Sequence, residues 1–288
     1  MAVPYKAPVK DIVFGYEVID SYNVLNKISA FSDFSEDIVI PTMEECAKFS
    51  EEVLAPINAI GDQQGATIKD GVVTMPEEFV DAYKKFAEAG WASISLPSDI
   101  GGGGMPITLS GGTLEILSTA NLAFGLAPGL SAGAISAINF HGNQEQKDKF
   151  LPKLVSGEWT GTMNLSEPQS GSDLGTITTK AEPQEDGSYK ITGTKVWITF
   201  GEHNMTENII HLVLAKVPGS PEGTKGISMF IVPKYIVNDD GSIGDSNNVS
   251  CISIEEKLGI HASPTCVMEY DGSVGYLVGE ENRGLNYM

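Results

Sequence analysis

Two short segments combine residue types suited to holding a planar ligand. The first runs from Met163 to Asp173 and puts hydroxyl groups, a proline and a glycine into one predicted loop, where hydroxyl and backbone donors can face a ligand. In the second, from Lys195 to Phe200, Trp197 and Thr199 are two residues apart on a predicted strand and so point to the same side of a sheet. An aromatic wall with a hydrogen-bond donor at its edge suits a flat heterocycle. A core tryptophan beside an ordinary turn would use the same residues.

Motifs for other chemistries are weak or missing in the sequence. Gly101 to Gly104 lack the Lys-Ser/Thr of a P-loop, so we expect a flexible connection between helices there. The chain has no G-x-S-x-G, H-E-x-x-H or kinase motif. No metal site is predicted, because the cysteines and histidines stand isolated, without disulfide or metal-ligand spacing: Cys46, Cys251, Cys266, His141, His203, His211 and His261.

Composition limits the class of protein. The chain has 288 residues, of which 38 are acidic and 18 basic, for a formal net charge of −20. The length suggests about two domains. The acidic surplus argues against nucleic acid as a partner, since phosphate binding needs clustered Lys and Arg. The opening MAVPYKAPVK lacks the apolar stretch of a signal peptide, so we expect a protein of the reducing cytoplasm.

One segment is long and apolar enough to resemble a membrane span. Residues 116–144 contain no Asp, Glu, Lys or Arg, and a spanning helix needs about 20 mostly apolar residues. The segment also holds Asn121, Pro128 and several glycines, and much of its apolar content is alanine. Small residues let helices approach closely, so we expect a buried helix in a helical domain and no integral membrane segment.

The hydrophobic pattern changes near residue 158 and predicts an α+β protein with segregated domains. Apolar residues before that point recur at helical spacing, and short β-rich runs between turn signals follow it. We expect an α-helical N-terminal domain over 36–157 and a β domain over 158–279. Residues 1–35 form a weakly patterned extension, and 280–288 look like a turn into a further helix. The expected strands include 196–200, 209–215, 227–232 and 251–254.

Four motifs, taken in order, make the chain resemble the acyl-CoA dehydrogenases. Members of that family carry a Thr-Glu-Pro-x-x-Gly-Ser-Asp loop, a Lys-x-Trp-Ile-Thr strand, a Gly-x-x-x-Ser-Pro-Thr stretch and a Gly-Glu-Glu-Asn-x-Gly-Leu stretch. Residues 166–173, 195–199, 259–265 and 279–285 match them, and four motifs in order are far more specific than one. The opening Tyr5-Lys6-Ala7-Pro8 also looks like the longer members with an N-terminal extension, which include 3-(methylthio)propanoyl-CoA dehydrogenases and fatty acyl-CoA enzymes.

The resemblance implies a helical N-terminal domain, a β-barrel-like middle domain and a C-terminal helical bundle beginning near Glu280. Only the first turn of that bundle falls within the chain, so we expect a fragment in which the C-terminal domain is missing. In this family the catalytic base sits on that domain, and we therefore assign no catalytic residue to the chain. Choosing Glu167 or Glu202 because a carboxylate is needed would put residue type before geometry.

The same resemblance implies the chemistry. Family members use FAD, in fatty acid metabolism among other roles, to oxidise an acyl-CoA substrate to the trans-2-enoyl-CoA. They pass the electrons to electron-transferring flavoprotein and form homo-oligomers. The flavin carries the redox chemistry, and the protein orients substrate and cofactor.

The predicted loop residues take their roles from their positions in the family motif. Met163, Leu165 and Ser166 would line the isoalloxazine and its pyrimidine edge. Gly171 belongs to the same cofactor loop, and Ser172 would contact the FAD pyrophosphate or the CoA part of the substrate. Ser166 stands where threonine is usual, and its hydroxyl can still donate.

The predicted strand residues complete the cofactor site. Trp197 would wall the flavin with Ile198 beside it, and Thr199 would hydrogen-bond flavin N5. Two other functions stay open from the sequence alone. An acyl-CoA oxidase-like flavoenzyme would give its electrons to oxygen, and a non-catalytic flavin-binding remnant would turn over no acyl-CoA.

Overall fold

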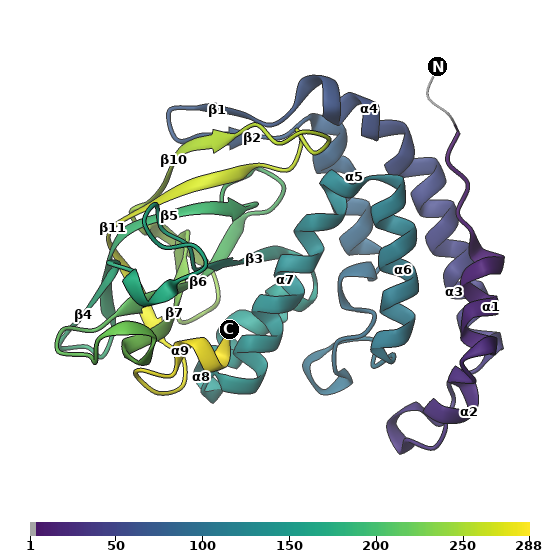
Figure 1. The fold of residues 1–288 in the computed structure, drawn as a ribbon, viewed down its shortest axis with the longest axis horizontal. Coiled ribbons are helices and arrows are strands. Elements are labelled where there is room, and N and C mark those ends of the chain that lie inside the picture. Colours follow the sequence, from purple (N-terminus) through teal and green to yellow (C-terminus); the bar gives the residue numbers. More distant parts are fainter. Residues whose placement is uncertain (1–3) are drawn as a thin grey trace.

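The computed structural model describes residues 4–288, so the first three residues of the predicted extension lie outside the described range (Figure 1). Helices fill the first half of the chain and strands most of the second, as the sequence predicts. The helices are α1 (Val9–Val18), α2 (Ser21–Leu25), α3 (Glu36–Phe49), α4 (Ala55–Gln64), α5 (Glu77–Glu88), α6 (Ile107–Ala120), α7 (Leu122–His141), α8 (Gln144–Val155) and a short α9 (Gly284–Tyr287).

The strands after residue 158 form the predicted barrel-like sheet. A ring closes as β11 (Thr265–Leu277) pairs with β5 (Tyr189–Thr199), β5 with β4 (Lys180–Pro183), β4 with β6 (Asn208–Lys216), β6 with β7 (Ile227–Pro233), and β7 with β11. Closure removes exposed strand edges. β10 (Val249–Glu255) adds to β11, and β3 (Trp159–Asn164) runs parallel to β6. β8 (Tyr235–Val237) and β9 (Ile243–Ser246) form a separate pair.

α5 shows how the helical half is built. Glu77 lies in its first turn, where the helix dipole favours negative charge. Phe79, Tyr83 and Phe86 follow at helical spacing on one face, and all three are buried. The rings of Phe86 and Phe124 meet edge to face with centroids 5.6 Å apart, which ties α5 to α7 in the core of the helical half.

A β-hairpin interrupts the helical half, although the sequence pattern predicts only helices there. β1 (Thr67–Lys69) and β2 (Val72–Thr74) pair around Asp70 and Gly71. Both turn residues have positive φ, 51° and 79°, as hairpin turns with Asp-Gly commonly do. Val73 is buried with residues of the sheet, so the hairpin joins the two halves.

The tetraglycine run is a close-packed turn and not the flexible connection that the sequence suggests. The backbone N–H of Gly102 donates to the Pro97 carbonyl at 2.9 Å, and that of Gly103 donates to the Ser93 carbonyl at 2.9 Å. A Cβ on Gly102 would lie 2.2 Å from the Leu96 carbonyl oxygen. Glycine is needed here because the backbone segments approach closely.

The charge-free helix α7 packs directly on the sheet. Among the described residues, it is the one helix long and apolar enough to cross a membrane by length and composition. A Cβ on Gly161 of β3 would come 2.4 Å from the Cβ of Ala134, and the Gly161 N–H donates to Ser131 Oγ at 3.1 Å. These contacts are those of a core helix, as the sequence predicts.

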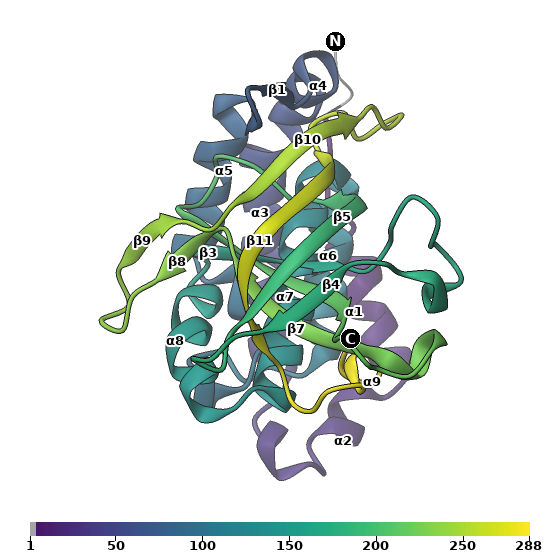
Figure 2. The same ribbon diagram turned by 90° about the vertical axis from the view of Figure 1, so that its left-hand side faces the viewer.

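The apolar core does not divide at residue 158. Phe200 and Met205 from the second half are buried in the same cluster as the helices α3 to α6. Conversely, Ile138 of α7 and Leu151 of α8 are buried with residues of β6 and β7. The sheet therefore lies against the helices as a continuous layer (Figure 2). The N-terminal segment packs on the helices too, where the Tyr16 hydroxyl donates to the Thr108 carbonyl at 2.7 Å.

Candidate functional site

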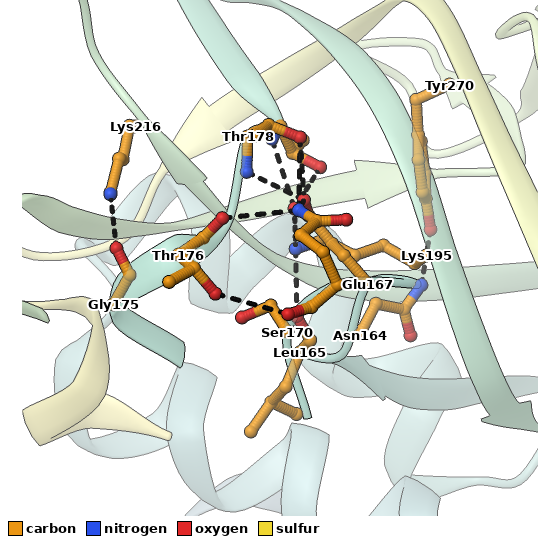
Figure 3. A network of polar contacts seen from close by, with 12 residues as sticks. Asn164, Leu165, Glu167, Ser170, Gly175, Thr176, Thr178, Lys195, Lys216 and Tyr270 are labelled. Atoms are coloured by element: carbon orange, nitrogen blue, oxygen red, sulfur yellow. Dashed lines mark hydrogen bonds and ion pairs between the residues drawn. The ribbon is translucent and has the colours of Figure 1, made fainter. Parts of the chain in front are cut away.

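The loop that follows β3 is held by one buried carboxylate, that of Glu167 (Figure 3). Its Oε2 accepts from Thr178 N at 2.7 Å, Thr178 Oγ1 at 2.9 Å and Gln169 Nε2 at 2.7 Å. Its Oε1 accepts from Thr179 N at 3.0 Å and Thr179 Oγ1 at 2.6 Å. A loop whose backbone would otherwise be exposed to solvent is therefore fixed at its centre.

Lys195 of β5 completes this cluster. Its side chain is fully buried, and Nζ donates to Glu167 Oε1 at 2.9 Å and to the Leu165 carbonyl at 2.9 Å. Burial raises the pKa of Glu167, but the Lys195 charge and the hydrogen bonds outweigh burial and hold that pKa at about 2. Burial lowers the pKa of Lys195 to about 8 against the opposing pull of Glu167. Both groups are therefore charged at neutral pH.

The rest of the loop is closed by its own hydrogen bonds. Glu167 and Ser170 exchange backbone hydrogen bonds at 2.9 Å each, and Ser170 Oγ donates to the Asp173 carbonyl at 2.6 Å. Asp173 Oδ1 in turn accepts from Gly175 N at 2.9 Å. The predicted cofactor loop is thus an ordered turn and not a mobile connection.

Trp197 stands out on β5, beside this loop. Its side chain is 48% exposed although it is a tryptophan within a strand, and its φ is +60°, in the left-handed region. The strand bulges here, since Lys195 pairs with Met268 and Ile198 with Cys266, which leaves two residues opposite one. The indole N–H donates to Glu255 Oε1 at 2.7 Å. The ring is thereby held with a face exposed to solvent.

The structure brings most of the other predicted residues near Trp197. A Cβ on Gly171 would lie 3.7 Å from the Trp197 ring, so the loop tip and the indole are neighbours. Ser172 is exposed at the same tip, and Thr199 is partly exposed further along β5. Ile198 points the other way, since it is buried in the sheet interior with 3% exposure. Its side chain therefore does not share the face of Trp197, and only its backbone can line that face.

The remaining three predicted residues lie where β3 ends. Met163 is half-buried, and its Sδ lies 2.7 Å from the place of a Cβ on Gly133, so its thioether rests on α7. Leu165 packs on the buried cluster of α7, α8 and β6. Ser166 is half-buried, and its carbonyl accepts from Val196 N at 3.0 Å, which joins the loop to β5 a second time.

The sequence does not predict a buried polar network that includes two residues of β3, Thr162 and Asn164. Thr162 Oγ1 lies 2.8 Å from His211 Nδ1 and donates to Asn164 Oδ1 at 2.8 Å, and Asn164 also bonds the Tyr270 hydroxyl. Burial lowers the pKa of His211 to about 3, and the Lys234 charge adds to the effect, so the ring is neutral. His211 is structural, as the sequence suggests, but its partners come from strands far apart in the sequence.

Glu202, the other carboxylate considered from the sequence, is also engaged. It is 3% exposed and pairs with Lys234 at 2.5 Å. Burial raises its pKa, although Lys234 opposes that shift. Among residues 4–288, no cluster of His, Cys, Asp and Glu side chains is arranged to hold a metal ion.

Comparison with known proteins gives matches over both halves of the chain. Residues 41–158 match the acyl-CoA dehydrogenase N-terminal domain and residues 162–273 its middle domain. The chain is 46% identical over 284 residues to 3-methylmercaptopropionyl-CoA dehydrogenase of Ruegeria pomeroyi, covering 99% of this chain and 48% of that protein. It is 37% identical over 284 residues to a butyryl-CoA dehydrogenase of Syntrophomonas wolfei, covering 96% and 46%. The chain spans about half the length of these curated relatives.

Solved structures show the same fold. The acyl-CoA dehydrogenase of Bacillus anthracis, complexed with FAD, superposes with a TM-score of 0.71 at 27% identity. The superposition covers 89% of this chain and 39% of that one. The butyryl-CoA dehydrogenase of Megasphaera elsdenii also superposes with a TM-score of 0.71, at 23% identity.

Proposed function

The chain belongs to the acyl-CoA dehydrogenase family through its N-terminal and middle domains, and from this premise we propose its reaction. The protein oxidises an acyl-CoA thioester to the trans-2-enoyl-CoA with bound FAD and passes the electrons to an electron-transferring flavoprotein. Three free, buried cysteines suit the proposed cytoplasmic location, where thiols stay reduced. We also infer a homo-oligomer, as the family resemblance implies.

The exposed indole of Trp197 is the observation that carries the proposal. Left-handed backbone at a non-glycine residue is often found at ligand sites, and the half-exposed indole of Trp197 offers an apolar surface that a flat ligand can cover. A flat isoalloxazine fits that face, with the Thr199 hydroxyl within the same stretch of strand and the loop tip at Gly171 beside the ring. The residues present therefore suit FAD.

FAD, when bound, supplies the acceptor for the hydride that leaves the β-carbon of the substrate. The chain would contribute orientation: Trp197 would wall one side, Thr199 would donate at the ring edge, and Met163 and Leu165 would close the site at the end of β3. Ser172, which is exposed at the loop tip, would bond a phosphate oxygen of FAD or the CoA part of the substrate, as the family motif implies.

The proposal takes its general base from outside these 288 residues. A base must reach the α-carbon with a free lone pair. Glu167 has both oxygens occupied by buried donors, and Glu202 is buried against Lys234. Glu255 already accepts from the Trp197 indole. Because the family resemblance implies a base on the C-terminal domain, we expect the 288-residue chain alone to turn over no acyl-CoA.

We propose 3-(methylthio)propanoyl-CoA as the first substrate to test. The support is the 46% identity to 3-methylmercaptopropionyl-CoA dehydrogenase across nearly all of this chain, against 37% to a butyryl-CoA dehydrogenase. Butyryl-CoA, whose acyl chain is one atom shorter and lacks the sulfur, is the comparison substrate.

The test begins with the coding DNA, read in frame beyond the codon for Met288. The complete product is purified, its flavin is identified by its spectrum after release, and reduction is followed with each acyl-CoA under anaerobic conditions. Flavin bleaching and enoyl-CoA formation with an electron-transferring flavoprotein as acceptor are the expected results. Absence of flavin, or no product from any acyl-CoA, would refute the proposal. Oxygen consumption without added acceptor would instead identify an oxidase.

A further inference from the structure

We propose that Glu167 and Lys195 form a positioning pair that fixes the distance between the two halves of the cofactor site. One half is the loop after β3, which carries Ser166 to Ser172. The other is the end of β5, which carries Trp197 and Thr199. The inference rests on the proposed function, since it concerns the same FAD site.

The sheet itself does not set the spacing of these two halves. In the strand order β5-β4-β6-β3, two strands separate β5 from β3, so no ladder of hydrogen bonds joins them. Within the described residues, polar links between the loop and β5 are Lys195 Nζ to Leu165 O, Lys195 Nζ to Glu167 Oε1, and Val196 N to Ser166 O. Two of the three depend on the lysine.

The Glu167 carboxylate also binds a third segment, residues 178–179. Each of its oxygens accepts one backbone N–H, from Thr178 and Thr179 respectively, in addition to side-chain donors. The segment that leads into β4 is thereby tied to the same point (Figure 3). With every lone-pair direction occupied, the carboxylate cannot take part in proton transfer, which makes Glu167 a positioning residue and not a catalytic one.

The ion pair of Glu167 and Lys195 contributes more to the orientation of the loop and strand than to the stability of the fold. Removing two charges from water costs about as much as their attraction returns, so a buried ion pair adds little net stability. Its hydrogen bonds, however, are directional and leave one arrangement of loop and strand. Trp197, two residues beyond Lys195, lies in the bulge of β5, so the lysine anchors the strand next to the bulge.

Glu167→Gln is the first test because the amide is nearly the same shape. In either orientation its NH₂ group would face a backbone N–H, of Thr178 or of Thr179, so one of these bonds must break. Glu202→Gln is the matched control, since Glu202 is also a buried glutamate paired with a lysine, the partly exposed Lys234, in the same β half. Both variants are made in the complete protein.

Two measurements report positioning separately from activity. Hydrogen exchange follows the amides of Thr178, Thr179 and Val196, and fluorescence titration with the visible spectrum follows FAD binding. For Glu167→Gln we expect exchange at these amides to speed up at least tenfold, FAD affinity to fall about tenfold and the flavin spectrum to shift. Glu202→Gln should leave all three unchanged.

A double variant, Glu167→Gln with Lys195→Met, separates positioning from the cost of a lone buried charge. It removes both charges, so we expect thermal stability to recover towards the wild-type value while FAD affinity and the amide exchange remain altered. Return of all three to wild-type values would show that the pair only supports folding and would overturn the inference. Wild-type protein that binds no FAD would overturn the proposed function first, and the inference with it.

Discussion

Trp197 differs from an ordinary strand tryptophan in two ways. Its φ is left-handed, and about half of its side chain is exposed to solvent. A left-handed φ costs a non-glycine residue about 1–2 kcal/mol, and the structure holds it with a bulge and the hydrogen bond to Glu255. Thr199 has no positive φ, pairs with Thr265 of β11 at the end of β5 and is only partly buried. The two residues therefore offer different tests of the same site.

Thr199→Val should leave the fold intact and weaken the flavin site in the complete protein. Valine has nearly the same shape and a high strand propensity, so the melting temperature should change little. Loss of one hydrogen bond at the ring edge is worth about 1 kcal/mol, or roughly fivefold in FAD affinity or in the rate of reduction. Flavin titration and stopped-flow reduction measure these, and unchanged values in both would show that the hydroxyl does not contact the cofactor.

The buried Glu167 should make the protein sensitive to acid. Its pKa is lowered from 4.5 to about 2 in the folded protein, since Lys195 and the threonine donors outweigh burial. Relative to a protonated carboxyl at this position, the stability added by the ionised form is therefore complete above pH 4.5 and is lost as pH falls towards 2. Between pH 6 and pH 3, the stability gap between wild type and Glu167→Gln should shrink by on the order of 2 kcal/mol. Urea unfolding at both pH values tests this, and a constant gap would contradict the assigned shift.

At the scale of elements, the tight turn at Gly101 to Gly104 differs most from its sequence pattern. Glycine runs read as flexible because glycine lacks a Cβ, but the same property lets two backbone segments touch. At Gly102, the absence of a Cβ lets the backbone touch the Leu96 carbonyl. Local sequence does not distinguish these cases, since the partner segment is known only after folding.

Gly102→Ala should therefore destabilise the protein by about 2 kcal/mol or more, because the new methyl group meets a backbone carbonyl. Gly111→Ala provides the control: it lies in α6 with nothing within 4 Å of the new Cβ, and alanine in a helix should add about 0.5–1 kcal/mol. Chemical denaturation of both variants gives the comparison. Equal changes in the free energy of unfolding for the two variants would mean that the turn can shift to accommodate the new methyl group at no cost.

Helices and strands with an uninterrupted hydrophobic periodicity could be predicted from the sequence. Elements in which that periodicity is interrupted could not. The change from helices to strands and the strands β5, β6 and β7 follow from periodicity. β11 is not among the strands that the pattern predicts, and its pairing with β5 shifts register between Asp271 and Ser273. In the site, the sequence predicts the strand bearing Trp197 and Thr199 but not the pairing of Glu167 with Lys195. Those two residues are 28 positions apart and meet only through the barrel.

At the scale of the whole molecule, the shared core predicts a single cooperative unfolding transition. Phe200 and Met205 fill the helical core, and α7 and α8 cover the sheet, so neither half keeps its core alone. Circular dichroism at helical wavelengths and tryptophan fluorescence should give coincident melting curves. Separate curves, or a stable folded product of residues 1–157, would show two independent domains.

The parallel pairing of β3 with β6 also sets an order of events during synthesis. Trp159 pairs with Asn208, so β3 emerges from the ribosome about fifty residues before β6, its partner strand. At roughly 5–20 residues per second, that interval is several seconds. During it, Ile138 of α7 lacks the residues of β6 and β7 among which it is buried in the folded protein. Nascent chains paused between residues 165 and 208 should therefore be the ones that chaperones bind, and release should follow the appearance of β6.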